Sequence, residues 1–507
     1  MIYFRNSFTS PLPWENRIED FYNNDVIANP APIVGSLTNG GKDVASYTKY
    51  PAVGLIGETV GWSAFIWFLI WFSIFRGVGM TGRVVYFTMG LPIITTIIFV
   101  GRALSLDNAG AGVKLLWGTW RGDQLASGTV WQTAVGQVFF STGIGFGYFT
   151  SYASYNQKHS NAVMDAVLIC EAVLQMPGAN FWAVLLFLTL IVLGFSSAFV
   201  MLDVVATLLV DSGVKYSRPV IVTTLTLVSF LMCLPYCTEF GYYLLDGVDR
   251  WINNIALIFV VFCEVVSATT VYRWKDVTEQ VGLLAFVVYN LGYFGGLLIG
   301  VTVAHGLESA GPGAGAGFGF FVACTIIAGV IAKPSEPCNA GIISKVRGQL
   351  SQMWYLAFYS GNQLRRDLNL IIGSGKNWKI PFFLPILLRY VSGPVLAVIF
   401  SFAFPEFHTL RYDPMMITGF ILSVLGMLAV LMGFVMPRYY DVFIPVERRD
   451  EGTKETVLNQ PMDKIDAVEV VASECDGGES GGMGEKSLVT ASRGEAASLG
   501  MREETVR

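Results

Sequence analysis

The stretch with the strongest capacity for chemistry is Val130–Tyr155, an apolar segment that carries three glycines within Ser141–Gly147. Each glycine weakens a helix by roughly 1 kcal/mol, so this density predicts a break at the middle of a membrane-spanning helix. Non-helical backbone in a bilayer is tolerated only where it is buried in protein or lines a cavity. Such a break frees carbonyl groups and half-helix ends that can hold ions or a small solute. Close helix packing through small residues is the alternative interpretation.

The remaining chemistry-bearing side chains form no catalytic or metal-binding pattern. The seven cysteines lack metal-ligand spacing, and most lie in apolar segments where cysteine acts as a small packing residue. The three histidines, at 159, 305 and 408, are scattered over loops and helix ends. We therefore expect neither a membrane enzyme nor a metal centre built on these residues.

The composition indicates the class of protein that contains the predicted helix break. Hydrophobic residues make up 53% of the 507 positions and charged residues only 14%, whereas soluble domains carry about 25% charged residues. Uncharged runs of 18 or more residues are long enough to cross a hydrocarbon core of about 30 Å. The net charge of −5 provides no basic surface for nucleic acid. The predicted fold class is an all-α polytopic membrane protein.

About ten spanning helices follow from the apolar runs. Their expected ranges are 58–76, 84–101, 130–155, 180–209, 218–236, 251–272, 281–304, 316–332, 381–403 and 415–436. A polar loop is expected at 12–56. From residue 446 onward the chain is rich in Glu, Gly, Ser and Lys, which predicts a disordered tail.

Loop charges predict the orientation of these helices, because short cytosolic loops carry an excess of Lys and Arg. The loop at 305–315 has neither residue and should face outside, which places the C-terminal tail in the cytosol. The helices at 130–155 and 180–209 then both end on the inside. Residues 161–180 between them are too short and too polar to cross, so we expect a spanning segment to be absent there.

Several motifs in order resemble the neurotransmitter:sodium symporters. The segment VWQTAVGQVFFSTGIGFG, followed by SYASYN, resembles the sixth transmembrane helix of that family. Further resemblances run from YFRNSFTSPLPW (end of helix three and the second outer loop) and FRGVGMTGRVVYFT (between helices four and five) to LGFSSAFVMLDVVATLLVD (helix eight) and DLNLIIGSGKNWKI with LRYVSGPVL (start of helix eleven). The resemblance covers most of residues 1–445.

This resemblance implies a partial inverted-repeat symporter fold in the plasma membrane, coupling Na⁺, with Cl⁻ as a second ion, to a small amino-acid-like solute. The implied solute contacts are Phe140, Phe146, Ser197, Ala198 and Met201. The implied sodium ligands are Ser141, the Leu193 carbonyl, Ser196 and Ser197, and half of a chloride site falls at Gln137 and Ser141. The implied gates are Asp246 or Asp249 on one side and Asp211 with Tyr155 on the other. Ser196 stands where many animal members carry Asp.

Relative to the family pattern, the chain looks truncated. Residues 1–57 resemble the end of helix three with an outer loop, 58–445 the transmembrane domain, and 446–507 the tail. Helices one and two, most of three, and seven have no counterpart, and 281–332 looks like an additional helix pair of the kind associated with fungal members. Three interpretations remain open: a sodium-coupled symporter, a non-transporting fragment or splice product, and a channel or membrane structural subunit.

Overall fold

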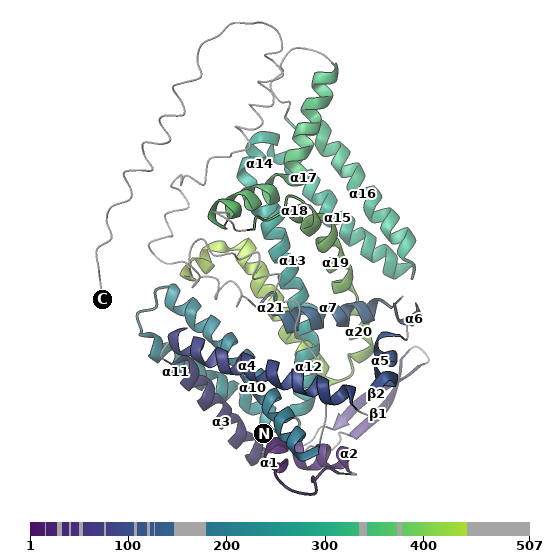
Figure 1. Cartoon of the computed structure of the whole chain (residues 1–507). Coiled ribbons are helices and arrows are strands. Elements are labelled where there is room, and N and C mark those ends of the chain that lie inside the picture. The colour runs from purple at the N-terminus through teal and green to yellow at the C-terminus, as the bar shows by residue number, and fades with distance from the viewer. Residues whose placement is uncertain are drawn as a thin grey trace, which may run out of the picture.

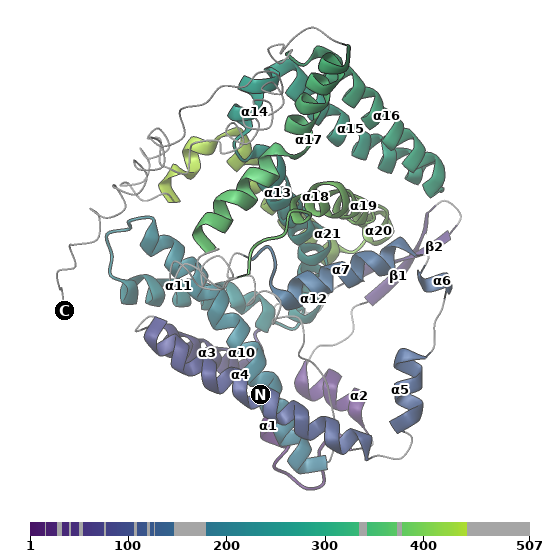
Figure 2. The ribbon, with the colours of Figure 1, turned by 45° about the horizontal axis from the view of Figure 1, so that its top comes forward.

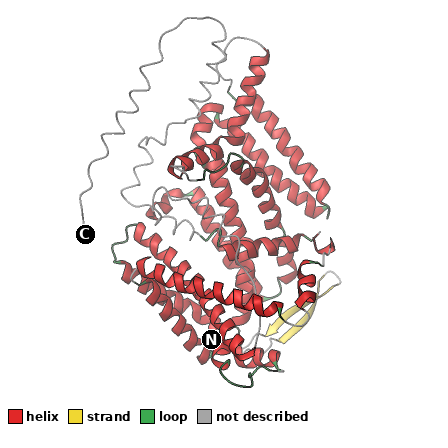
Figure 3. Ribbon diagram, viewed as in Figure 1, coloured by secondary structure: helices red, strands yellow, loops and turns green. Residues whose placement is uncertain are grey.

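The computed structural model describes residues 1–443, except for 16, 28–32, 40–41, 50–53, 76–77, 106–108, 119–121, 126, 147–178, 334–341 and 373–377. The described chain is helical apart from one β-hairpin (Figure 3). The expected tail at 446–507 lies outside the described residues.

The first 57 residues hold more structure than the loop expected there. Short helical segments α1 (Ile2–Asn6), α2 (Ile18–Asp20) and η1 (Phe21–Val26) precede an antiparallel hairpin of β1 (Ile33–Asn39) and β2 (Lys42–Lys49). The sequence Asn-Gly-Gly from residue 39 is typical of hairpin connections, and alternating Val, Ser and Thr on both sides suit strands. A polar composition therefore does not distinguish a loop from a β-hairpin.

One group of helices lies at the lower left of Figure 1. It consists of α3 (Gly57–Ile74), α4 (Val78–Leu104), α10 (Ala179–Asp211) and α11 (Arg218–Cys233), the last extended by η2 (Leu234–Cys237). Its buried core contains Ile70, Ile74, Phe199, Leu202, Ala206 and Val222. Because lipid tails are as apolar as these side chains, close packing rather than water exclusion holds the helices together. We call these four helices the first group.

A long interrupted helix runs through the rest of the molecule. It comprises α12 (Gly241–Trp251), η3 (Ile252–Leu257), α13 (Ile258–Val266) and η4 (Ser267–Val271), and two of its segments are π-helical. Helix α21 (Pro414–Val435) packs closely on α12, where Gly247 and Gly419 let the two backbones touch. Beside α13 lies a second interrupted span of α18 (Leu384–Leu387), η5 (Leu388–Ser392), α19 (Gly393–Ser401) and α20 (Ala403–Leu410).

A helical hairpin of α15 (Leu283–Gly306) and α16 (Ala310–Ile331) forms the edge of this second part (Figure 1). Glycines make the close approach of the two helices possible. A Cβ added to Gly317 would lie 2.5 Å from the Gly296 carbonyl oxygen, well inside van der Waals contact. Helices α14 (Trp274–Val281) and α17 (Ile342–Ile372) cover one end of the hairpin. We call the elements from α12 to α21, together with α7 (Gly128–Thr142), which packs against η3 and α19, the second group.

Nine helices in the described residues are long and apolar enough to cross a membrane. They reproduce nine of the ten expected spans, with ends shifted by a few residues except at 251–272, where the span begins ten residues earlier, at Gly241. The tenth, 130–155, corresponds to α7 (Gly128–Thr142), and residues 147–155 are not described by the structure. The remaining elements are α5 (Ala109–Trp117), α6 (Gly122–Leu125) and η6 (Pro437–Phe443). The expected multi-pass helical fold is confirmed.

Candidate functional site

The predicted break in the glycine-rich segment is present. Helix α7 ends at Thr142, and Gly143 and Gly145 have positive φ angles of 75° and 85°. The Gly143 and Ile144 amides both donate to the Phe139 carbonyl, at 2.8 and 3.2 Å, as at glycine-terminated helix ends. The prediction of non-helical backbone is confirmed for residues 143–146. It was wrong for residues 141 and 142, which complete the last helical turn, and residue 147 is not described.

The alternative interpretation of these glycines, close packing, also holds at one of them. A Cβ at Gly145 would lie 3.0 Å from the side chains of both Leu257 and Val261. The turn after α7 is therefore pressed against η3 and α13. Glycine serves two purposes here, because the positive φ and the close approach both exclude larger residues.

Two aromatic side chains flank the break, as predicted. The rings of Phe140 and Phe146 lie 6.0 Å apart between centroids and meet edge to face at 72°. Phe140 is 40% exposed, so its ring is available to a ligand rather than locked in the core. These are the two residues that the resemblance implies as aromatic walls of a solute pocket.

The predicted hydroxyl ligands all turn back onto their own helices. Ser141 donates to the Gln137 carbonyl at 2.7 Å, while Ser196 and Ser197 donate to the Leu193 carbonyl at 2.7 and 3.3 Å. A hydroxyl that donates its proton in this way keeps its oxygen lone pairs as acceptors. The oxygens are therefore able to coordinate a cation, but within the described residues none of the three hydroxyls bonds to a group on another helix.

The structure does not bring the two halves of the implied sites together. Helix α7 packs against η3 and α19, whereas α10 packs against α3, α4 and α11, and Figure 2 shows the same separation. Ala198 on α10 packs against the core of the first group, and Met201 is half-buried on the same helix. Within the described residues, Phe140 and Ser141 thus belong to one part of the molecule and Ser196 and Ser197 to another.

The predicted gate residues lie at exposed positions. Asp246 and Asp249 are both exposed on α12, and the Asp249 carboxylate accepts a hydrogen bond of 3.2 Å from Asn253. Asp211 is exposed at the last residue of α10. Tyr155 lies outside the described residues. The structure places no basic partner within salt-bridge distance of these three carboxylates in the part of the chain that it describes.

Two ion pairs, one with a buried carboxylate and one partly exposed, escaped the sequence reasoning. Asp203 of α10 is 1% exposed and pairs with Arg218 at the start of α11, at 2.5 Å. Glu406 of α20 pairs with Arg250 at 3.4 Å and accepts a hydrogen bond of 3.4 Å from Asn254. The available signal was a charged residue inside an apolar run, which marks a buried pair or a functional group.

Another buried charge, Arg389 of η5, has no carboxylate partner among the described residues. Its guanidinium donates to the Thr269 carbonyl at 2.9 Å and to Asn290 at 3.0 Å, and more weakly to the Ala357 carbonyl at 3.4 Å. Three rings surround the cation, with centroids 5.4 to 5.8 Å from its central carbon: Tyr289, Tyr293 and Tyr390. Carbonyl dipoles and aromatic faces thus replace the missing anion. Arg389 joins η4, η5, α15 and α17.

A polar cluster lies just beyond the membrane end of η4. Tyr272 donates a hydrogen bond of 2.7 Å to Asp367, whose other oxygen accepts one of 3.0 Å from Gln363. Burial, together with the Asp367 carboxylate, raises the pKa of Tyr272 to about 12. Burial alone would lower the pKa of Arg273, but Asp367 and Asp276 outweigh it and shift that pKa upward. At neutral pH the cluster therefore keeps a neutral phenol and a charged guanidinium.

Known transporter sequences are similar to this chain. A sequence model of the sodium:neurotransmitter symporter family matches residues 53–171 and 170–295. A creatine transporter of Torpedo marmorata is 27% identical over 343 residues, 53% of this chain and 55% of the relative. A sodium-dependent serotonin transporter of Drosophila melanogaster is 27% identical over 348 residues, 55% of this chain and 54% of the relative.

Other relatives match less of their length. A sodium- and chloride-dependent glycine transporter 2 of Xenopus laevis is 24% identical over 267 residues, 43% of this chain and 34% of the relative. The chain thus spans about half or less of the length of these curated relatives. All are transporters, and the helix break and the membrane spans described above lie mostly within the matched region. Residues 53–295 of this multi-pass membrane protein are thus similar to the sodium:neurotransmitter symporter family, which is a family of transporters and not of enzymes.

Proposed function

We propose that this chain has the sequence of a sodium-coupled symporter of a small amino-acid-like solute. The observation that carries this proposal is the end of α7 at Gly143, flanked by Phe140 and Phe146, within the region matched by the family. A helix that stops inside an apolar segment exposes carbonyls and a helix end, the groups that hold ions and solutes in transporters with broken helices. The names of the relatives mention sodium, chloride, amino acids and amine transmitters.

Sodium is the proposed coupling ion because the polar groups near the break and on α10 are hydroxyl and carbonyl oxygens, which hard cations prefer. Ser141 would contribute to one sodium site, and Leu193, Ser196 and Ser197 to a second. Chloride, bound in part by Gln137 and Ser141, is the proposed second ion. Ser197, Ala198 and Met201 complete the proposed solute pocket, and the gates are Asp246 or Asp249 with Asp211 and Tyr155.

The second part of the proposal is that residues 1–507 alone do not perform coupled transport. The hydroxyls of α7 and those of α10 lie in separate helix groups, so each proposed sodium site holds at most about half of a shell of oxygens. An ion in half a shell recovers its hydration from water, and dehydrating it is unfavourable. Expression in transport-null cells tests this. Background accumulation of amino acids, unchanged when sodium is replaced, is expected, and sodium-dependent accumulation would contradict it.

A third part concerns the connection between α7 and α10. We propose that a spanning segment corresponding to helix seven is absent there. Two observations support this: the loop charges place both flanking helix ends on the same side, and the family match divides into two segments that meet at Cys170–Glu171. The same charges support a cytosolic tail, and we propose the plasma membrane as the location. Protease digestion of intact cells, with an epitope at residue 507, should leave the epitope intact.

A membrane structural subunit without transport is the second candidate, and the separation of the two half-sites favours it. Sodium-dependent solute uptake separates the two candidates, and in any form of the protein that transports, Ser197→Ala tests the proposed sodium site. The variant loses one sodium ligand and should need about tenfold more sodium for half-maximal uptake. Ser212→Ala, one residue beyond the end of α10 and with a similar hydroxyl-to-backbone bond, should leave that concentration unchanged. Equal sodium dependence of the two variants would identify Ser197 as a packing residue.

A further inference from the structure

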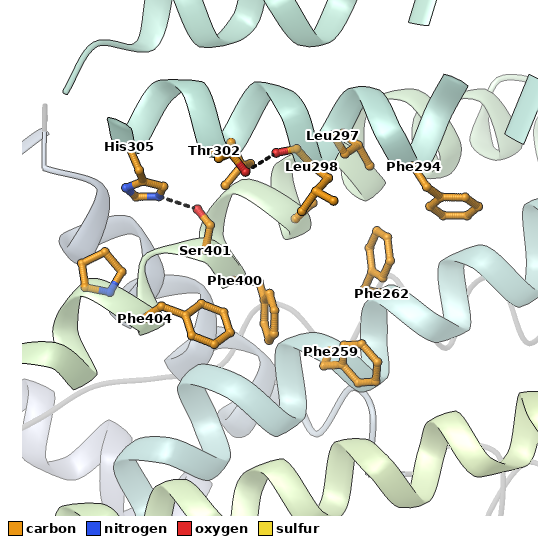
Figure 4. Close-up of a pocket in the computed structure, with 13 residues that line it drawn as sticks. Phe259, Phe262, Phe294, Leu297, Leu298, Thr302, His305, Phe400, Ser401 and Phe404 are labelled. Atoms are coloured by element: carbon orange, nitrogen blue, oxygen red, sulfur yellow. Dashed lines mark hydrogen bonds between the residues drawn. The ribbon is translucent and has the colours of Figure 1, made fainter. Parts of the chain in front are cut away.

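A cavity of about 600 Å³ lies between α13, α15, α19 and α20 (Figure 4). Its volume falls in the range of small-molecule sites in proteins, about 300 to 1,000 Å³. All four helices belong to candidate membrane spans, so the cavity adjoins the hydrocarbon of the bilayer. None of the residues proposed above for ions, solute or gates lines it.

The walls of the cavity are aromatic and rigid. Five phenylalanines contribute to the lining: Phe259, Phe262, Phe294, Phe400 and Phe404. They support one another, with centroids 6.0 Å apart between Phe259 and Phe400 and 5.5 Å apart between Phe400 and Phe404. Aromatic rings fixed by their neighbours provide a preformed surface for a flat apolar body. A flexible acyl chain would lose more conformational freedom on such a surface than a rigid ring system.

The polar side chains of the cavity gather toward one end. Figure 4 shows His305 and Ser401 at the end opposite Phe262 and Phe294, joined by a hydrogen bond of 2.9 Å. Ser401 also donates to the Val398 carbonyl at 2.6 Å. Because a hydroxyl carries a single proton, His305 must donate from Nε2 to Ser401, which leaves Nδ1 as an acceptor. In the described part of the chain no donor reaches that nitrogen, so a ligand hydroxyl is a suitable partner.

The charge of the lining narrows the class of ligand further. No lysine, arginine, aspartate or glutamate is among the lining residues. Phosphate and carboxylate groups require cationic donors for tight binding, so a phospholipid head group or a zwitterionic amino acid does not fit. A neutral molecule with a rigid apolar body and one terminal hydroxyl does.

We propose that this cavity binds a membrane sterol, with its rings against the phenylalanines and its hydroxyl donating to His305. The ligand enters from the bilayer and bridges the α15–α16 hairpin to α13 and α19. Because it binds only the folded arrangement of these helices, it stabilises that arrangement in proportion to its occupancy.

The test uses the full chain in phosphatidylcholine nanodiscs with a cholesterol analogue that carries a photoreactive diazirine on its rings. Labelling should map to peptides containing residues 294–305 or 397–405 and should be competed by excess cholesterol. Dioleoylglycerol, a neutral lipid with one hydroxyl and two flexible chains, should compete at least about tenfold less well. Equal competition by the two lipids, or labelling spread evenly over the spanning helices, would overturn the proposal.

Two variants sharpen the test. Ala397→Trp fills the cavity and should reduce labelling about tenfold or more, whereas Ala64→Trp, in the shallow groove between α3 and α11, should leave it unchanged. His305→Ala should weaken competition by cholesterol about fivefold but not competition by cholestane, which lacks the hydroxyl. An equal loss for both competitors would show that His305 does not bind the hydroxyl. The competition experiment on the unaltered chain decides the proposal even where Ala397→Trp fails to fold.

Discussion

The two helix groups differ in how their polar side chains are used. In the first group polar contacts tie two helices at a time, as in Trp71 to Thr223 and Thr189 to Thr95, both at 2.9 Å. In the second group Arg389 alone reaches three neighbouring elements. Burial differs in the same direction for three spans of the second group, those through α12–α13, α15 and α18–α20, of which 33–44% is buried. The spans of the first group are 17–22% buried, and so are α16 and α21 of the second group.

This difference distinguishes polar residues that stabilise the fold from polar residues that are proposed to bind an ion. Helices in a bilayer associate through close packing and interhelical hydrogen bonds, and the spans through α12–α13, α15 and α18–α20 of the second group have more of both. The hydroxyls proposed for sodium binding bond only to their own helices. We therefore expect substitutions at cross-helix polar residues to affect stability, and substitutions at the proposed ligands to spare it.

The largest effect is expected for Arg389→Met. It removes the donor shared by Asn290 and two backbone carbonyls, and buried acceptors left without a donor cost about 1–3 kcal/mol each. We expect a loss of about 4 kcal/mol in the free energy of unfolding, measured by thermal denaturation in detergent. Arg389→Lys keeps the charge but not the planar guanidinium, so its free energy of unfolding should lie between those of Arg389→Met and the unaltered chain. If Arg389→Met has the same melting temperature as the unaltered chain, the contacts of Arg389 do not stabilise the second group.

A somewhat smaller loss, about 3 kcal/mol, is expected for Arg218→Ala in the first group, because Asp203 is left buried without its partner. The double variant Asp203→Asn with Arg218→Ala should recover part of this stability, since no charge then remains buried. The same denaturation assay measures both. If the double variant is no more stable than the single one, the pair is not coupled.

Substitutions at two glycines of α16 test its packing against α15, with changes in stability of intermediate size expected. Gly317→Ala places a Cβ 2.5 Å from the Gly296 carbonyl oxygen and should destabilise the protein by about 1–3 kcal/mol. The control Gly315→Ala points into open space and should stabilise the helix by up to about 1 kcal/mol. The two changes are chemically identical, so effects of the same sign would mean that α15 and α16 do not pack as described.

The smallest effect is expected for Ser141→Ala at the end of α7. Its hydroxyl bonds only to carbonyls of its own helix, so the free energy of unfolding should change by less than about 0.5 kcal/mol. A loss above about 1 kcal/mol would show that the hydroxyl is structural, and the contrast between the two groups would then be weaker than proposed.

Much of the fold followed from apolar length alone. A run of about 20 uncharged residues has to be helical in hydrocarbon, because only a helix satisfies its own backbone groups there, and nine of the ten expected spans appear in the described residues. The break after Thr142 followed from glycine density in the same local way. The β-hairpin at Ile33–Lys49 did not, since a polar sequence suits both a loop and a strand.

The candidate site, like the fold, has features that the sequence predicted and features that it did not. The sequence by itself determined which residues carry hydroxyls, rings and flexible backbone, because these are properties of a residue and its immediate neighbours. Only the tertiary structure decided that α7 and α10 lie in different groups, that Asp203 meets Arg218, and that His305 and Ser401 form the polar end of an apolar cavity. Contacts between distant segments depend on how helix faces pack, and the pattern within one helix does not specify its neighbour.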